Sequence, residues 1–509
     1  MGEASRIQID LALPILLPAA YGLLMLLFAP ASRRDARWLG VFGVIGMSAC
    51  ALMPAAILWI RSRAELPILT GGSVAERVVS IDRPSLHIAS LIGLVGVAAL
   101  ALEVKEAGRR RWSGEIYSLH FFVVTGLMMA IHTENLFMLF VGIEVVFLAS
   151  LVLGAVLKRD TPGLRSSLEY FVIGNVGAGF SALGTALVFS VTGAFSYASL
   201  TGEAVREEAA SARLGPEALL AGLALILAGL AIQGAIPPFH GWRARTLETA
   251  TSPLVVVRLV AVPVAVAAVV SRLSLAIRQG ASGLIDHWLS TLSILSLVAM
   301  AYGIVSLLRQ RTLRGMVEPT VLVQMGFFLA TALLSPTERE DLLFLQMLLA
   351  SGGTIALIVL FDSLEGRSAS PKRPMRSWQG LWSRHRGAAI VLTLLLLSLG
   401  GWMPAGLWLK RGIVIEALGQ ERRILATCLV LAGVLLALHY ASVLISVFAR
   451  SRPARISSDV KVSGSRSGHL GEGVQSPTLS RTGTIVLVAI SILLIFVDLV
   501  EGIARWQAG

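Results

Sequence analysis

Long apolar runs recur along the 509-residue chain and are separated by shorter polar stretches. A helix needs about 20 apolar residues to cross the roughly 30 Å hydrocarbon core of a bilayer, and about fourteen runs reach that length. No run shows a continuous alternation of polar and apolar residues, so the pattern predicts an all-α polytopic membrane protein with about fourteen transmembrane helices. The runs are centred near Leu17, Gly46, Gly93, Thr125, Val145, Ala182, Ile226, Ala261, Ser296, Gly326, Thr354, Leu397, Val434 and Leu493.

Lysine and arginine gather in every second connection between the runs. Cytoplasmic connections of membrane proteins retain these residues, so the bias predicts that both termini lie on the non-cytoplasmic side. Two of the basic connections, 364–386 and 450–482, are rich in Ser, Gly and Pro, which is typical of flexible linkers. They either anchor the protein by their charge or bind anionic headgroups or a partner subunit.

The composition supports a membrane protein and argues against several other classes. Only 15% of the residues are charged, against roughly 25% in soluble domains. The net charge of +12 fits basic residues retained on the cytoplasmic side, so no nucleic acid is expected as a partner. Cys50 and Cys428 lie far apart in apolar runs, as small buried residues do. Neither metal-ligand spacing nor a nucleotide, haem or iron–sulfur motif is present, so no cofactor is expected in this chain.

Charged side chains within apolar runs are costly in a bilayer and therefore indicate function. Glu144, in "ENLFMLFVGIEVVFLASLVLG", and Lys410, in "LSLGGWMPAGLWLKRGIVIEAL", can each exchange a proton when buried. The adjacent Arg411 leaves open that Lys410 extends to the interface instead. Arg258 supplies a fixed charge, because a guanidinium keeps its proton. Arg272 also falls within or beside a run.

Two apolar runs are interrupted by helix-breaking residues. Pro237 and Pro238 interrupt the seventh run, and Pro404 and Gly406 interrupt the twelfth. The breaks are five runs apart, and five is odd, so the pattern predicts two inverted five-helix repeats with a site at mid-membrane. The expected divisions are 1–115 for the first three spans, 116–275 and 286–449 for the repeats, 450–482 for a flexible basic cytoplasmic loop, and 483–509 for the last span.

Polar residues accompany the first break, in "AIQGAIPPFHGW". Gln233 and His240 can bind water or the backbone groups that the break leaves free, which favours a hydrated path. His120 and His439 also lie in apolar runs. They either join a proton path or make structural hydrogen bonds.

Several stretches together resemble the antiporter-like membrane subunits of complex I and of related antiporters and membrane-bound hydrogenases. They are "HTENLFMLFVGIEVVFLASLVL", "EYFVIGNVGAGF", "PPFHGW", "LRQRTLRGMVEPTVLVQMGF" and "GGWMPAGLWLKRG", which follow the family order over roughly residues 80 to 450. Lys410 and "LLASGGTIALIVLFDS" most resemble subunit N within this family.

The resemblance implies a proton path through a glutamate in span five and lysines in spans seven, eight and twelve. Glu144 and Lys410 match the first and last of these positions. The span-seven lysine falls on Gln233, and the span-eight lysine falls near Pro263. A neutral amide can bind water but cannot carry a charge, so the first repeat departs from the family pattern.

The sequence thus predicts a proton-translocating, antiporter-like subunit of a redox-linked complex in a bacterial cytoplasmic membrane. Its partners would be the lipid bilayer and other antiporter-like and redox subunits, which would perform the redox chemistry while protons pass through this chain. Two alternatives stay open. The chain could be a non-pumping structural subunit, because lysines of the family are replaced, or a subunit of a cation/proton antiporter or of an inorganic-carbon uptake system.

Overall fold

The computed structural model describes most of the chain up to residue 449. The described ranges are 3–30, 36–64, 69–70, 79–107, 113–157, 161–200, 216–242, 251–278, 282–334, 336–365, 378–402, 404–420 and 422–449. The expected linker 450–482 and the expected last span 483–509 lie outside the described residues.

Each apolar run up to the one centred near Val434 coincides with a helix. Ten helices of the described part are long and apolar enough to cross a membrane, and three shorter apolar helices accompany them. The helices of the N-terminal half are α1 (Glu3–Phe28), α2 (Ala36–Ala64), α3 (Arg83–Ala107), α4 (Ser113–His132), α5 (Leu136–Leu157), α6 (Thr161–Thr192), the 3-10 helix η3 (Tyr197–Leu200), α8 (Pro216–Gln233), α10 (Ser252–Val256), the π-turn η4 (Val257–Ala261) and α11 (Val262–Arg278). Those that follow are α12 (Ser282–Arg309), η5 (Arg314–Met316), α13 (Val317–Ala332), α14 (Pro336–Glu365), α15 (Leu381–Arg384), α16 (Arg386–Gly400), α17 (Pro404–Gly419) and α18 (Arg423–Phe448).

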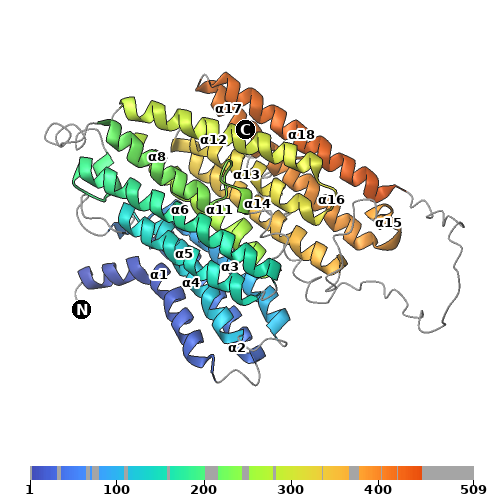
Figure 1. The fold of residues 1–509 in the computed structure, drawn as a ribbon, viewed down its shortest axis with the longest axis horizontal. Helices are drawn as coiled ribbons and strands as arrows, with labels where there is room; N and C mark the ends of the chain where they lie inside the picture. Colours follow the sequence, from blue (N-terminus) through green and yellow to red (C-terminus); the bar gives the residue numbers. More distant parts are fainter. Residues whose placement is uncertain are drawn as a thin grey trace, which may run out of the picture.

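The helices lie side by side in a broad array (Figure 1). α1 and α2 lie at one end of the array, and α17 and α18 lie at the other. The first set of five helices comprises α4, α5, α6, α8 and the α10–α11 segment, and the second comprises α12, α13, α14, α16–α17 and α18. The fourth helix of each set is interrupted, as the sequence pattern predicts.

The segment α10–η4–α11 forms the buried centre of the array. It packs against α3, α4, α13 and α14, and its apolar residues are fully enclosed. Pro263 lacks an N–H, and its ring would collide with the carbonyl of Leu259 in a regular α-helix. The chain relieves this conflict with the π-turn just before Pro263, where the Val262 N–H bonds to the Val257 carbonyl instead. Arg258 lies within that turn.

Short extended segments tie three connections together at one face of the helix array. Strands β1 (Leu69–Thr70) and β2 (Ser80–Ile81) pair antiparallel, with Leu69 opposite Ile81. Isolated bridges join Val79 to Thr133 and Asn135 to Ser196. The end of α4, the start of α5 and the turn before η3 therefore lie together at this face.

Candidate functional site

Glu144 lies near the middle of α5 and is half-buried. Its Oε1 atom is shielded from solvent and has no hydrogen-bond partner within the described part of the chain. Tyr170 on α6 interacts electrostatically with both Glu144 and Arg258. An uncompensated carboxyl group at mid-helix is costly in an apolar environment, which is the property expected of a proton-binding group.

Arg258 is 3% exposed and makes defined contacts with the first five-helix set. Its Nη2 atom donates a hydrogen bond of 2.7 Å to the Ser150 carbonyl on α5. Its guanidinium carbon lies 3.9 Å from the centre of the Tyr170 ring, a cation–π distance. The Ser150 and Tyr170 hydroxyls are 3.0 Å apart. Arg258 therefore lies beside Tyr170 and against the helix that carries Glu144.

The first helix break places Trp242 against the same cluster. α8 ends at Gln233, and Ala235 adopts a positive φ of 50° in the turn that follows. The Trp242 indole N–H donates to the Ile232 carbonyl at 3.1 Å, which also accepts from the Ala235 N–H at 3.2 Å at the end of α8. The Trp242 and Tyr170 rings lie 4.8 Å apart. Pro237 and Pro238 lie in the turn between the end of α8 and Trp242, and a cis peptide bond joins them.

Gln233 faces a small cavity at the end of α8. The side chain is 3% exposed, and its Nε2 atom has no partner among the described residues. The cavity has a volume of about 10 Å³, and Ile143 and Val146 of α5 contribute to its wall. That is the smallest space that admits one water molecule. The Gln233 amide is the polar group of this otherwise apolar cavity.

His240 follows the break and connects the two five-helix sets. Its ring centre lies 3.9 Å from that of Tyr302 on α12. The sequence places His240 on the proton path, whereas its closest ring contact in the structure is with the second set. His240 therefore lies between the two sets.

The second break brings Lys410 onto the end of α16. Gly401 adopts φ +80°, a left-handed conformation that ends the helix. Gly406 packs against it, since a Cβ there would lie 3.0 Å from the Gly401 Cα. The Lys410 ammonium donates to the Gly400 carbonyl at 2.9 Å and to the Leu399 carbonyl at 3.4 Å. The charge thus lies at the negative end of the α16 dipole and not at the interface. α17 begins at Pro404, as expected.

Polar and aromatic groups of the second set surround this ammonium. Its nitrogen lies 5.1 Å from the centre of the Phe327 ring, and the Gln324 amide donates to the Leu399 carbonyl at 3.1 Å. A largely apolar groove of about 590 Å³, open at the surface of the helix array, lies beside Lys410 between α17 and α18. The Thr320 and Tyr440 hydroxyls lie 2.8 Å apart on buried faces nearby. Lys410 therefore has both carbonyl acceptors and an adjoining space.

The two remaining histidines differ in their surroundings. The Nδ1 of His120, a residue 1% exposed, donates to the Ile116 carbonyl one turn earlier at 2.9 Å, which is a structural hydrogen bond. His439 is half-buried on α18, and its Nε2 has no partner in the part of the chain that the structure describes. Neither contacts Glu144 or Lys410 by a hydrogen bond given for the described residues. Within those same ranges, no group of three or more His, Cys, Asp or Glu side chains is arranged to hold a metal ion.

Sequence reasoning named the charged residues but missed their partners. Tyr170 and Trp242 lie in the quoted motifs "EYFVIGNVGAGF" and "PPFHGW", but no role was expected for either. Ser150 and the Thr320–Tyr440 pair carry no signal beyond a hydroxyl within an apolar run. Their contacts join helices that are distant along the chain and so require the fold.

The family model described as "NADH:quinone oxidoreductase/Mrp antiporter, TM" matches residues 133–437. This range is more than half of the chain and contains Glu144, Gln233, Arg258 and Lys410. The chain belongs to this family.

Relatives and solved structures agree with this assignment. NADH-quinone oxidoreductase subunit N of Gemmatimonas aurantiaca is 30% identical over 375 residues, which cover 71% of this chain and 69% of the relative. Subunit N 1 of Sorangium cellulosum is 28% identical over 380 residues, 73% of this chain and 74% of the relative. A chain of respiratory complex I from Thermus thermophilus with bound aureothin has a TM-score of 0.73 at 18% identity and covers 96% of this chain and 97% of its own. A chain of the Mrp complex from Dietzia sp. has a TM-score of 0.76 at 19% identity, with coverage of 97% and 95%.

These findings confirm the predicted family and the predicted fold class of a polytopic helical membrane protein. They also favour an antiporter-like subunit of a complex I-type membrane complex over the alternative of a non-pumping structural subunit.

Proposed function

We propose that this chain moves protons within a complex I-type complex of a bacterial cytoplasmic membrane, through Glu144, the Gln233 region and Lys410. The observation that carries the proposal is the position of Lys410. Its ammonium is held by the two carbonyls at the end of an interrupted helix and borders an apolar groove that opens at the surface of the helix array. Such an ammonium is stabilised by carbonyl dipoles when charged, and a lysine in apolar surroundings can exchange its proton.

The first five-helix set would work with a fixed charge instead of a second lysine. Arg258 keeps its proton and lies against Tyr170, which also interacts electrostatically with Glu144. When Glu144 is ionised, this guanidinium stabilises it through the intervening ring and hydroxyl groups. When Glu144 is protonated, Arg258 remains satisfied by the Ser150 carbonyl and the Tyr170 ring. Glu144 can therefore cycle while Arg258 stays in place.

Water would connect the two sets across the molecule. Gln233 cannot change charge, but its amide can donate to a water and accept from it. The cavity beside it accommodates about one water molecule, and His240 lies between the two sets. Protons then pass by exchange along waters and side chains, while partner subunits perform the redox chemistry. The distribution of basic connections supports an orientation with both termini on the non-cytoplasmic side.

The test uses the whole membrane complex, assembled in its native membrane or in proteoliposomes. Glu144→Gln and Lys410→Met each remove one exchangeable proton, so each should lower the number of protons moved per electron. The matched control is Glu217→Gln, which removes an exposed carboxylate at the opposite end of α8 from Gln233. An unchanged proton-to-electron ratio in both Glu144→Gln and Lys410→Met, in complexes that assemble and transfer electrons, rules the proposal out.

A further inference from the structure

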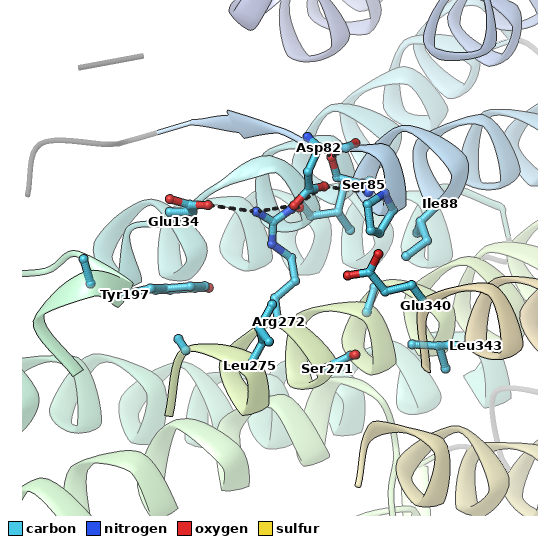
Figure 2. A pocket seen from close by; sticks show the side chains of 15 residues that line it. Asp82, Ser85, Ile88, Glu134, Tyr197, Ser271, Arg272, Leu275, Glu340 and Leu343 are labelled. Carbon is cyan, nitrogen blue, oxygen red and sulfur yellow. Dashed lines mark hydrogen bonds and ion pairs between the residues drawn. The ribbon is translucent and has the colours of Figure 1, made fainter. Parts of the chain in front are cut away.

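A second polar cavity lies where α4 ends and α5 begins, away from Glu144 and Lys410. It has a volume of about 280 Å³ and is shown in Figure 2. Residues from α3, α4, η3, α11 and α14, and Asp82 and Glu134 from connections, contribute to its wall. No function assigned above involves this cavity.

The wall of the cavity is built by backbone pairing and not by isolated side chains. The Tyr197 N–H donates to the Glu134 carbonyl at 2.8 Å, and the Leu136 N–H donates to the Phe195 carbonyl at 2.8 Å. Together with the bridge from Asn135 to Ser196, these bonds hold η3 against the connection between α4 and α5. Glu134 and Tyr197 are therefore fixed side by side at the cavity.

Arg272 of α11 occupies the centre of the cavity wall (Figure 2). Its Nη2 lies 3.3 Å from the Asp82 carboxylate and 3.4 Å from that of Glu134. Its Nη1 donates to the Ile131 carbonyl at 2.8 Å, near the end of α4. Glu340 adds a third carboxylate to the lining. Three carboxylates against one guanidinium give the cavity a net negative charge, which concentrates cations and protons.

Tyr197 is the unsatisfied group of this cavity. The residue is 5% exposed, and its hydroxyl has no hydrogen-bond partner within the described ranges. Figure 2 shows its phenol ring directed into the cavity toward Arg272. Burial raises the pKa of this phenol, so it stays protonated and can both donate and accept a hydrogen bond. A buried hydroxyl without a partner needs a water or a ligand in the space before it.

The polar cavity adjoins the small cavity beside Gln233. Ala130 of α4 and Val269 of α11 line the small one. Their neighbours in the chain, Ile131 and Ala268, line the polar one. The same stretches of α4 and α11 thus contribute to the walls of both spaces.

We propose that this cavity is an aqueous vestibule through which the first five-helix set exchanges protons with one face of the membrane, with Tyr197 and Glu134 relaying them. The proposal rests on the proposed function, because it supplies the outer end of that path. In the relay, Tyr197 gives its hydroxyl proton to the Glu134 carboxylate or to a water on one side, while a protonated water on the other side gives a proton to the hydroxyl oxygen. Tyr197 is thereby restored, and no net charge is left on the ring.

Further charged groups among the described residues line this cavity or lie close to it. Asp82 and Glu340 supply further acceptors, Arg272 pairs with Asp82 and Glu134, and His132 lies close enough to interact with Asp82 and Arg272. The vestibule lies at the face that the basic connections place outside the cytoplasm.

Thiol labelling tests whether the vestibule is aqueous. Ser271 lines it, and Val269 lines only the small cavity on the same helix. In a complex whose chain carries Cys50→Ala and Cys428→Ala, we expect a membrane-impermeant cationic thiol reagent to label Ser271→Cys from the non-cytoplasmic face. Val269→Cys should stay unlabelled, because a space of about 10 Å³ admits nothing larger than water. An unlabelled Ser271→Cys, or equal labelling of both variants, overturns the proposal.

Removal of one hydroxyl tests the relay itself. Tyr197→Phe should lower the number of protons moved per electron while electron transfer continues. The matched control is Tyr21→Phe, which alters an aromatic cluster on α1 far from the vestibule along the chain. An unchanged ratio in Tyr197→Phe overturns the relay. If Glu144→Gln and Lys410→Met also leave the ratio unchanged, the proposed function fails with it. The labelling result still decides whether the vestibule exists.

Discussion

At the scale of single residues, Arg258 binds the Ser150 carbonyl and the face of Tyr170, so its planar guanidinium uses two kinds of contact that an ammonium would satisfy less completely. A guanidinium keeps its proton, so in the proposed function proton exchange in the first five-helix set is left to Glu144.

A residue-scale prediction concerns the pH dependence of stability at Asp82. Burial would raise the pKa of Asp82, but Arg272 and hydrogen bonds from Ser85 outweigh it and hold the pKa below its ordinary value of about 3.9. A lowered pKa stabilises the fold above the ordinary value, and the contribution is lost as pH falls through the folded value. Thermal unfolding of the solubilised complex should therefore show Asp82→Asn less stable than the parent at neutral pH.

The difference between parent and Asp82→Asn should persist down to about pH 4 and close below it, where Asp82 takes up a proton. A difference that already closes between about pH 7 and pH 5 would contradict the ion pair with Arg272 as its origin.

The candidate site shows which residues a sequence can reveal. Glu144, Arg258 and Lys410 stand out because a charge within an apolar run needs no knowledge of the fold. The carbonyl partners of Lys410 could not be predicted, because they depend on the angle at which α17 returns onto α16. The vestibule was missed for a related reason. Its carboxylates lie in connections, where charged residues are ordinary.

At the scale of elements, the two interrupted helices use different terminators. The end of α8 is satisfied by a tryptophan ten residues beyond Ile232, and the end of α16 by a lysine and a left-handed glycine. Proline and glycine predicted both breaks, since these residues act locally on the backbone. A different proline, Pro263, accounts for the π-turn that precedes it. The helix continues through this turn because it is buried at the centre of the array, which the sequence alone does not reveal.

An element-scale prediction follows from Gly401. Its φ of +80° costs an L-amino acid about 1–2 kcal/mol, and a Cβ would lie 2.8 Å from Cδ of Lys410. Gly401→Ala should therefore lower the thermal stability of the subunit and shift Lys410 away from the Gly400 carbonyl. The proton-to-electron ratio should fall with it.

The control is Gly387→Ala, at the start of the same helix. Nothing lies within 4 Å of a Cβ at Gly387, so we expect no loss of stability or coupling there. Equal effects of the two substitutions would show that the break tolerates a side chain, contrary to the backbone geometry.

At the scale of the whole molecule, length and hydropathy were sufficient to predict the helices. Each run within the described residues forms a helix, because a bilayer leaves the backbone no other way to satisfy its polar groups. The order of the helices within the array, with α10–α11 at its centre, could not be read from hydropathy, since lipid-facing and protein-facing helices are equally apolar.

A whole-molecule prediction concerns orientation. Thr161 begins α6 beside a basic connection, and Ala194 follows the other end of that helix. In the background that lacks native cysteines, a membrane-impermeant thiol reagent should label Thr161→Cys only from the cytoplasmic face and Ala194→Cys only from the opposite face. The reverse pattern would place both termini in the cytoplasm.

The continuous span Ser252–Arg278 has a mechanical consequence. It carries Arg258 near one end and Arg272 near the other, about 21 Å apart at 1.5 Å per helical residue. Such a distance exceeds the Debye length of about 8 Å at physiological ionic strength, so the two charges communicate weakly through solvent. The helix itself instead connects the two residues rigidly. If this helix slides or rotates, the contact of Arg258 with Tyr170 and the ion pairs of Arg272 with Asp82 and Glu134 must change together.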